Sequence, residues 1–265
     1  MKLIVDGDIL LFRACAAVEK DVSFGDTHVL YSKFEDAKCV LEDMVHELQE
    51  QANTDEVIFS LSDSKNWRRN IFKEYKANRK GSRKPLCYSD LQEYAIQHWE
   101  SMRFLGIEAD DIMGIYADRE GYAIWSLDKD LKQCPGHHLV DDEIIYISKQ
   151  QGDRFHMYQT LVGDPTDNYK GCPGVGDAGA EDFLTQPFEY YEEWSTLKSG
   201  PNKGQQRVTW KKKPTNNIWR GIVSHFEKHG LTEADALVQA RVARILQDGE
   251  YDFEKEEVKL WNPIN

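Results

Sequence analysis

The chain has 265 residues, 40% of them hydrophobic, and a formal net charge of −13. This length suffices for one large domain or two modest domains with a buried core. No apolar run approaches the roughly 20 residues of a membrane-spanning helix, and the chain enters a strand at once, so neither a membrane span nor a signal peptide is expected. The five cysteines are widely spaced and contain no Cys-x-x-Cys pair, which favours reduced thiols in a cytosolic protein.

The predicted elements form an α/β region followed by an α region. Residues at helical spacing predict helices, and short apolar runs bounded by polar residues predict buried strands of a parallel sheet. In chain order these are a strand at 3–5, a helix at 34–48, a strand at 57–61, helices at 91–104 and 112–117, a strand at 123–127, an edge strand at 138–140, and helices at 218–229 and 231–247. No further strand is expected after about residue 155. Thr232 is the expected N-cap of the last helix and Gly249 its C-cap.

Acidic residues follow each of the first three predicted strands. They are Asp6 and Asp8 after 3–5, Asp63 after 57–61, and Asp128 and Asp130 after 123–127. Ligands of a parallel sheet bind outside the carboxyl ends of its strands, where these acids would gather. A single acid there is more often a turn residue, but several together repel one another unless a cation lies between them. Oxygen ligands suit Mg²⁺ or Mn²⁺, so the pattern predicts a divalent-metal site and phosphoryl chemistry.

Two further acidic patches lie outside these strand ends. Glu108, Asp110 and Asp111 fall within four positions, which is more than compensation of a helix dipole requires. Asp164 and Asp167 stand in a Gly-Asp-Pro-Thr-Asp segment that alone would be an ordinary turn. Shortly after it, Gly174-Val175-Gly176 could offer backbone N–H groups to a phosphate, although a plain loop is the alternative.

Positive charge is concentrated in two windows of this acidic chain. Residues 65–84 hold nine basic residues and one acid, and residues 198–213 hold six basic residues and no acid. A basic stripe on an acidic protein is typical of phosphate-backbone binding. A solvated helix face remains the alternative for an isolated run, and for the 198–213 segment both readings stay open. Gly81 and Pro85 are expected to interrupt a helix here.

These motifs together resemble the flap endonuclease / 5′→3′ exonuclease family, and within it the exonucleases of T-seven-like podophages. The resemblance covers nearly the whole chain. The segments that carry it are Val5-Asp6-Gly7-Asp8, Ser62-Asp63, Tyr75-Lys76-Ala77-Asn78-Arg79-Lys80, Glu108-Ala109-Asp110-Asp111, Asp128-Lys129-Asp130, Gly163-Asp164-Pro165-Thr166-Asp167 and Gly174-Val175-Gly176.

The resemblance implies a fold and a division into domains. The fold is α/β, with a mostly parallel central sheet flanked by helices, a helical arch and a C-terminal helix-hairpin-helix (helix–three-turn–helix) DNA-binding region. The nuclease core would span residues 1–157, with the basic arch at about 65–104. The helical region with the DNA clamp would span 158–265.

The resemblance also assigns roles to residues. Asp6, Asp63, Glu108 and Asp110 would hold one Mg²⁺, with Asp111 helping through water, and Asp128, Asp130, Asp164 and Asp167 would hold the second. Lys76 and Arg79 would neutralise the scissile phosphate. Tyr75 would either stack on a terminal base or pack at the base of the arch. The implied DNA contacts are Lys80, Arg83, Lys84, Gly174, Val175 and Gly176, with a K⁺ ion at the glycine-rich loop.

The implied activity is Mg²⁺-dependent 5′→3′ exonucleolysis of duplex DNA, with Mn²⁺ as a substitute. Flap cleavage and removal of RNA from RNA–DNA hybrids would accompany it. The substrates would be duplexes with 5′ ends, nicks, gaps or flaps. The setting would be phage replication, recombination and host DNA breakdown in the bacterial cytoplasm. A PIN-type ribonuclease and a non-catalytic DNA-binding protein are the alternatives.

Overall fold

The computed structural model describes residues 1–79 and 81–263, which form two compact units. Of the described residues, unit 1 comprises 1–70, 79, 81–153 and 245–260, and unit 2 comprises 71–78, 154–244 and 261–263. Each unit is therefore assembled from separate stretches of chain. The single boundary expected between residues 157 and 158 stays a prediction. Within the described residues, no helix is long and apolar enough to cross a membrane.

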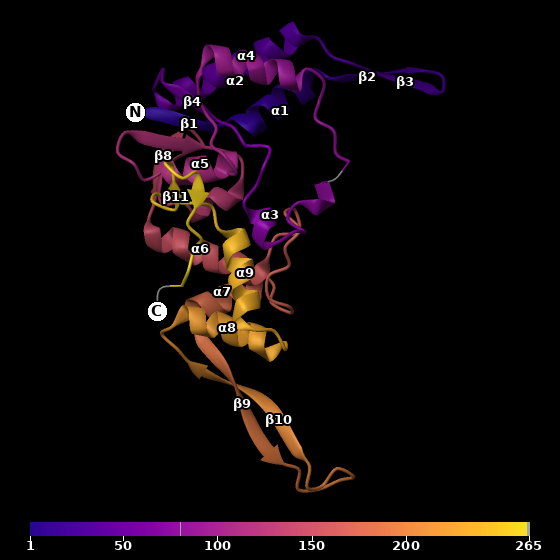
Figure 1. The fold of residues 1–265 in the computed structure, drawn as a ribbon, viewed down its shortest axis with the longest axis vertical. Coiled ribbons are helices and arrows are strands. Elements are labelled where there is room, and N and C mark those ends of the chain that lie inside the picture. Colours follow the sequence, from indigo (N-terminus) through magenta and orange to yellow (C-terminus); the bar gives the residue numbers. More distant parts are fainter. Residues whose placement is uncertain (80, 264–265) are drawn as a thin grey trace. The chain divides into compact units, whose positions relative to one another are not determined.

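A six-stranded sheet forms the centre of unit 1 (Figure 1). Its order is β5-β4-β1-β6-β7-β8, and neighbours are parallel except for the antiparallel pair β7–β8. The strands are β1 (Lys2–Asp6), β4 (Val57–Ser60), β5 (Glu100–Met102), β6 (Tyr122–Trp125), β7 (Gly136–Val140) and β8 (Glu143–Ile147). The prediction of a mostly parallel sheet is confirmed, and the three predicted apolar strands are its central members.

The strand predicted at 138–140 is not an edge strand. Asp141 and Asp142 both adopt positive φ, at 46° and 67°. This backbone is typical of the two-residue turns that join antiparallel strands. β8 therefore folds back on β7 and takes the edge position.

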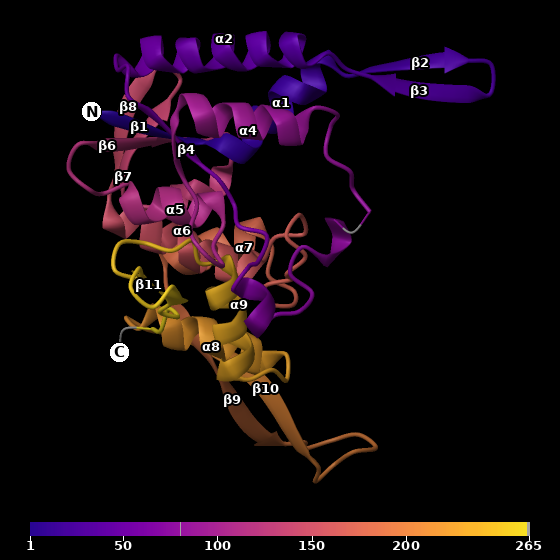
Figure 2. The same ribbon diagram turned by 45° about the horizontal axis from the view of Figure 1, so that its top comes forward.

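Helices cover both faces of the sheet, because successive strand residues point to opposite sides. Leu3, Val5 and Phe59 face a cluster that includes α1 (Gly7–Val18), α2 (Phe34–Ala52) and α4 (Tyr88–His98). Ile4, Ile58 and Ile124 instead pack with Met113 of α5 (Ala109–Tyr116) on the opposite face. Figure 2 shows α1, α2 and α4 on one side of β1 and β4, with α5 on the other. The helix predicted at 34–48 is confirmed as part of α2.

The helix predicted at 91–104 is wrong at its C-terminal end. α4 ends at His98, Trp99 is extended, and Glu100–Met102 forms β5. Residues 99–102 pack against the sheet instead of extending the helix. Ser101 pairs with Phe59 of β4, and the centre of the Trp99 ring lies 5.3 Å from that of the Phe59 ring. An unpredicted hairpin of β2 (Lys20–Phe24) and β3 (Thr27–Tyr31) follows α1.

The basic segment does not form the expected helical arch in the described residues. It contains only α3 (Arg68–Ile71) and the short 3₁₀ helix η1 (Ala77–Arg79) before α4 begins. Nine cations with a single acid place like charges at helical neighbour spacing, which disfavours a helix, and Gly81 and Pro85 disfavour it further. Lys80, an expected DNA contact, lies outside the described residues.

Unit 2 is mainly helical but also contains a long hairpin that the sequence prediction missed. α6 (Lys149–Val162), α7 (Asp177–Thr185), α8 (Ile218–Lys228) and α9 (Glu233–Ala243) contribute to its core around Phe183, Ile222 and Phe226. The nine-residue strands β9 (Phe188–Thr196) and β10 (Gln206–Pro214) pair along their full length. The expectation of no strand after residue 155 is therefore wrong. A helix-hairpin-helix remains a proposal.

α9 begins as predicted and ends early. Thr232 and Asp235 form a reciprocal capping box at its start. The helix stops at Ala243 because Arg244 is extended, so Gly249 is not its C-cap. Residues 245–260 belong to unit 1 and include the small hairpin of β11 (Tyr251–Asp252) and β12 (Glu257–Val258).

Candidate metal centre and nucleic-acid contacts

Asp6 is the most deeply buried carboxylate at the carboxyl edge of the sheet. It ends β1 with an exposed fraction of 3%. Its Oδ1 accepts the Ile9 amide at 3.0 Å, which caps α1, and its Oδ2 accepts the Ser126 hydroxyl at 3.0 Å. Burial, together with the charges of Asp8 and Asp128, raises the pKa of Asp6 to about 7. Negative charge therefore accumulates at the ends of β1 and β6.

Asp8 and Asp63 flank this edge and are held by donors from neighbouring segments. Asp8 accepts the Ser62 amide at 3.0 Å and the Tyr88 hydroxyl at 2.9 Å. Asp63 accepts the Gly106 amide at 2.8 Å and the Ser64 amide at 2.7 Å. These backbone hydrogen bonds, the one from Gly106 above all, lower the pKa of Asp63. Asp63 is thus kept ionised, whereas Asp6 resists ionisation.

Asp128 and Asp130 lie just beyond β6 in the same unit. Asp128 caps the short 3₁₀ helix η2 (Lys129–Gln133) by accepting the Asp130 amide at 2.9 Å. Its own amide donates to the Ser126 hydroxyl oxygen at 3.0 Å, and that hydroxyl also bonds Asp6. Ser126 therefore links the ends of β1 and β6, a role that the sequence analysis did not assign.

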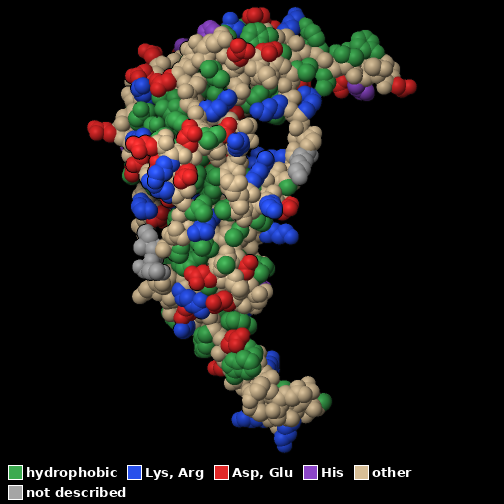
Figure 3. All heavy atoms as spheres, viewed as in Figure 1, with side chains coloured by type: hydrophobic (Ala, Val, Ile, Leu, Met, Phe, Trp, Pro, Cys, Tyr) green, Lys and Arg blue, Asp and Glu red, His purple; other side chains and the backbone are tan. Residues whose placement is uncertain are grey.

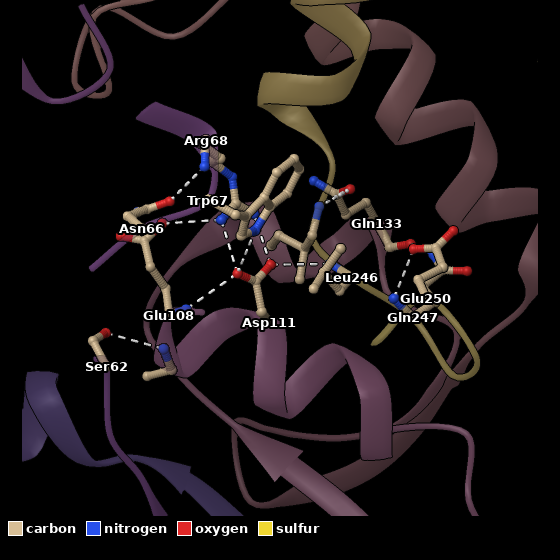
Figure 4. A network of polar contacts seen from close by, with 12 residues as sticks. Ser62, Asn66, Trp67, Arg68, Glu108, Asp111, Gln133, Leu246, Gln247 and Glu250 are labelled. Carbon is tan, nitrogen blue, oxygen red and sulfur yellow. Dashed lines mark hydrogen bonds and ion pairs between the residues drawn. The ribbon is translucent and has the colours of Figure 1, made fainter. Parts of the chain in front are cut away.

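Asp111 has a different environment from the other acids (Figure 4). It is fully buried in α5, and the buried Arg68 grips both of its oxygens, with bonds of 2.7 and 2.8 Å. The Trp67 indole N–H and the Leu246 amide donate to the same carboxylate, at 3.2 and 3.1 Å. A buried carboxylate with this many donors is fixed by the protein itself.

This network joins the start of α3, the start of α5 and the returning C-terminal chain. Arg68 also bonds Glu108, at 3.1 Å, and Glu108 and Asp111 form the capping box of α5. Gln133 accepts the Ile245 amide at 2.8 Å nearby. No local signal in the sequence distinguishes the buried Arg68 from its exposed neighbour Arg69.

Within residues 1–79 and 81–263, no three Asp, Glu, His or Cys side chains are placed to hold a metal ion together. Of the expected ligands, the first unit carries Asp6, Asp63, Glu108, Asp110, Asp111, Asp128 and Asp130. Asp164 and Asp167 belong to the second unit. Their roles as ligands stay predictions.

Lys76 and Asp167 are joined within unit 2. The Lys76 ammonium lies 3.6 Å from Asp167 Oδ2, and the Lys76 amide donates to the Asp167 carbonyl at 2.9 Å. Lys76 adopts a left-handed backbone with φ of 53°. Asn78 donates to the carbonyls of Pro165 and Thr166, which ties the same segment to the turn. Within unit 2, residues 76–78 are thus tied to the Asp-Pro-Thr-Asp turn.

Tyr75 is buried, with an exposed fraction of 3%. Its ring packs with Tyr169, Val242 and Ala243, and its hydroxyl donates to Asp167 at 2.9 Å. Of the two roles left open for Tyr75, this environment favours packing over stacking on a base.

The other cations expected to contact DNA are exposed, and Arg83 and Lys84 each contact a neighbouring side chain. Arg79, Arg83 and Lys84 are exposed in unit 1. The Arg83 guanidinium pairs with Glu19, which lowers the pKa of that carboxyl to about 2. The Lys84 ammonium lies 3.8 Å from the centre of the Tyr88 ring.

The glycine-rich loop precedes α7 in unit 2. Gly174 has φ of 73°, a conformation that L side chains rarely adopt, and Gly176 is the N-cap residue of α7. Both glycines are exposed and Val175 is half-buried. The backbone of this loop is therefore accessible at the start of a helix.

The profile described as "5'-3' exonuclease, N-terminal resolvase-like domain" matches residues 1–161. The exonuclease of Escherichia phage T7 is 36% identical over 98% of this chain and 93% of its own length. The chain belongs to the 5′→3′ exonuclease family, as its sequence motifs predicted.

Other family members are similar over much of the chain. The exodeoxyribonuclease of Enterobacteria phage T3 is also 36% identical, over 98% of this chain and 92% of its own length. A 5′-3′ exonuclease of Bacillus subtilis is 27% identical over 77% of this chain and 76% of its own. Among solved structures, a bacteriophage T5 flap endonuclease complex with DNA and metal ions has a TM-score of 0.51 and 16% identity. It covers 69% of this chain and 74% of its own, and indicates a shared fold.

Proposed function

We propose that this protein is a metal-dependent 5′→3′ exonuclease of duplex DNA that also cleaves 5′ flaps. The observation that carries the proposal is the placement of Asp6, Asp63 and Asp128 after β1, β4 and β6. These strands are adjacent and parallel, in the order β4-β1-β6. Family membership and the relatives named exonucleases support the same activity.

The donor set fits Mg²⁺, with Mn²⁺ as a substitute. Its oxygen ligands are the type that both ions prefer. The raised pKa of Asp6 supports a cation here, because a positive charge would relieve the repulsion among Asp6, Asp8 and Asp128. The residues proposed to bind metal in unit 1 are Asp6, Asp63, Glu108, Asp110, Asp128 and Asp130. Asp111 is proposed instead to hold Glu108 and the start of α5 in place.

Divalent ions held by these carboxylates would supply an activated water and stabilise the charge on the leaving 3′-oxygen. The protein's own contribution is orientation. Ser126 and the Ile9 amide hold Asp6, and the Gly106 and Ser64 amides hold Asp63. These hydrogen bonds limit the orientations that each carboxylate can adopt, as partners of metal ligands do.

Lys76 and Arg79 are proposed to neutralise the scissile phosphate. Asp167 keeps the Lys76 ammonium in one position until a phosphate competes for it. Lys80, Arg83 and Lys84 are proposed to follow the 5′ strand. The loop of Gly174, Val175 and Gly176 is proposed to bind duplex phosphates, with a K⁺ ion beside it. The N–H groups of the two glycines would make these contacts, because the Val175 N–H donates to the Cys172 carbonyl. Metal binding by Asp164 and Asp167 rests on the family resemblance.

The proposed substrates are duplex DNA with 5′ ends, nicks, gaps or flaps, and RNA–DNA hybrids. The proposed setting is replication, recombination and host DNA breakdown in a bacterial cell infected by a phage. Phage relatives that match almost the full chain support this setting.

A substrate panel tests the proposal against a ribonuclease and against a non-catalytic DNA-binding protein. Labelled duplex DNA, duplex with a 5′ flap and single-stranded RNA are incubated with Mg²⁺ or with chelator. We expect Mg²⁺-dependent cleavage of both DNA substrates, and its near abolition in Asp128→Asn with DNA binding retained. Asp153→Asn, which changes an exposed carboxylate paired with Lys149, is the matched control and should retain activity. Cleavage of RNA alone, or near-native activity of Asp128→Asn, would contradict the proposal.

A further inference from the structure

The β9–β10 hairpin presents an aromatic face that the core of unit 2 covers only at its base. In the antiparallel register Trp194 lies opposite Val208, Trp210 opposite Glu192, and Tyr190 opposite Lys212. Directly opposite residues share a face, and alternate residues along a strand share it too. Tyr190, Trp194 and Trp210 therefore line one face of the hairpin.

Only the base of this face is covered. Phe188 packs into the core of unit 2, and the Tyr190 amide donates to Ser224 of α8 at 2.9 Å. Farther out, Trp194 is 62% exposed and Val208 is exposed beside it, while Trp210 is half-buried. An exposed tryptophan on a projecting hairpin contributes little to a core, which points to a ligand.

The outer part of the hairpin is positively charged although the whole chain is acidic. Residues 194–208, which form this outer part, contain three basic residues and no acid, against a net charge of −13 for the chain. Figure 3 shows basic side chains around the hairpin tip and hydrophobic side chains along its stem. The acids of β9 that pair with β10 cations, Glu189 and Glu193, lie on the other face with Lys213 and Lys211.

Cations also border the aromatic face. The Lys212 ammonium lies 4.0 Å from the centre of the Phe188 ring, and the Lys228 ammonium of α8 lies 4.1 Å from that of Tyr190. Aromatic rings bordered by cations combine a surface for base stacking with charges for phosphates. This is the combination by which proteins bind single strands without sequence preference.

We propose that the β9–β10 hairpin is a binding arm for single-stranded nucleic acid, with bases stacked on Trp194 and Trp210 and phosphates near Lys198 and Lys203 at the tip. A duplex would leave the tryptophans unused, because its bases are already stacked. A second copy of this hairpin would bring a net charge of +3 against +3, because residues 188–214 hold six basic residues and three acids. The source of the strand rests on the proposed function, since 5′→3′ digestion of a duplex leaves the complementary strand single.

Binding of a fluorescent oligo-dT of about 20 nucleotides to the full chain, in chelator, tests this proposal. We expect Trp194→Ala to weaken binding by at least about five-fold, and Trp194→Phe to restore most of it, because stacking requires only an aromatic ring. Phe24→Ala is the matched control, since Phe24 is 67% exposed on the β2–β3 hairpin, and it should bind like wild type.

The charged tip is tested by salt titration of the same oligonucleotide. Replacing both Lys198 and Lys203 by Ala should lower the slope of log affinity against log salt by about 0.7 for each lost phosphate contact. Lys149→Ala, on the exposed Lys149–Asp153 pair of α6, should leave the slope unchanged.

Two further readouts separate this proposal from its competitors. Cleavage of a short blunt duplex with Mg²⁺ should be unchanged in Trp194→Ala. If the proposed nuclease function is wrong, wild type will not cleave this duplex either, and that failure is distinct from a failure of the hairpin to bind oligo-dT. Oligo-dT binding by Trp194→Ala equal to that of wild type would overturn the proposal. So would a change from dimer to monomer in Trp194→Ala with unaltered oligo-dT binding, which would identify a self-association surface.

Discussion

The pKa values of two aspartates at the same edge of the sheet are shifted in opposite directions. Asp6 is buried and resists ionisation, whereas backbone hydrogen bonds to Asp63 favour its ionised form. A metal-binding edge needs both carboxylates charged when the ion arrives. In the protein without metal, ionisation of Asp6 is therefore expected to lower the stability of the fold, whereas ionisation of Asp63 is expected to raise it.

Removing each charge should change stability with opposite sign. In Asp6→Asn, the amide oxygen can still accept the Ile9 N–H and the amide nitrogen can donate to Ser126. The substitution therefore removes the unfavourable charge and keeps both hydrogen bonds. We expect this variant, in chelator at pH 8, to gain on the order of 2–4 kcal/mol in the free energy of unfolding. Asp63→Asn should lose stability, because its amide cannot accept two backbone donors equally well. Urea unfolding of both variants makes the comparison, and equal shifts of the same sign would contradict it.

The same difference predicts a pH dependence. The pKa of Asp6 rises from an ordinary 3.8 to about 7 on folding, so the folded state binds the extra proton between these values. Its contribution to the free energy of unfolding should fall as pH rises from about 4 to about 7. Asp6→Asn should flatten this part of the stability profile. A wild-type profile in chelator that lacks the fall relative to Asp6→Asn would show that Asp6 is ionised throughout.

Lys76 and Lys84 are expected to differ in what they contribute. Lys76→Ala should reduce the single-turnover cleavage rate at saturating enzyme on the order of 10²–10³-fold, because a positioned cation stabilises developing charge. Lys84→Ala should mainly weaken DNA binding and lower the salt slope by about one unit. Single-turnover rates and salt titrations of both variants separate these effects. If both lose only affinity, Lys76 has no catalytic role.

At the residue scale, the sequence predicted positions at strand ends better than it predicted partners. Asp6, Asp63 and Asp128 could be placed because the carboxyl ends of parallel strands meet at one edge. Asp111 could not be told from Asp110, because their difference lies in burial beside Arg68, which is more than 40 positions earlier in the chain. Tyr75 was left open for the same reason.

The Arg68–Asp111 pair should stabilise elements rather than supply chemistry. It connects α3, α5 and the chain at Leu246. Arg68→Ala should lower the free energy of unfolding by about 3–5 kcal/mol, because it leaves a buried carboxylate without its counter-charge. Arg119→Ala, which breaks the exposed pair with Asp248, is the matched control and should cost about 1 kcal/mol or less. Equal losses of stability in urea unfolding would mean that the buried Arg68 network contributes no more to stability than an exposed ion pair.

Strands could be predicted where burial on both faces of the sheet dictates a continuous run of apolar residues. β1, β4 and β6 are covered on both faces, so continuous apolar runs mark them. β9 and β10 are exposed and mix aromatic, acidic and basic residues, and β5 follows directly after a helix, so no period distinguishes these strands. The capping box at Thr232 marked the start of α9, but its end depends on where the chain returns to unit 1.

At the scale of the whole molecule, the charge pattern was informative and the domain pattern was not. The basic windows at 65–84 and 198–213 could be found by counting. The division into units could not, because residues 71–78 and 245–260 join units that lie elsewhere in the sequence. Family membership was predictable because its acidic motifs follow successive elements along the whole chain.

The direction of digestion tests the central claim most directly. Identical duplexes carrying a label at either the 5′ or the 3′ end of one strand are incubated with the full chain and Mg²⁺, and product lengths are mapped over time. We predict that the 5′ label is released first in short products, while the 3′ label remains on a shrinking strand, and that chelator stops both. Release of the 3′ label first, with 5′ ends left intact, would contradict the account.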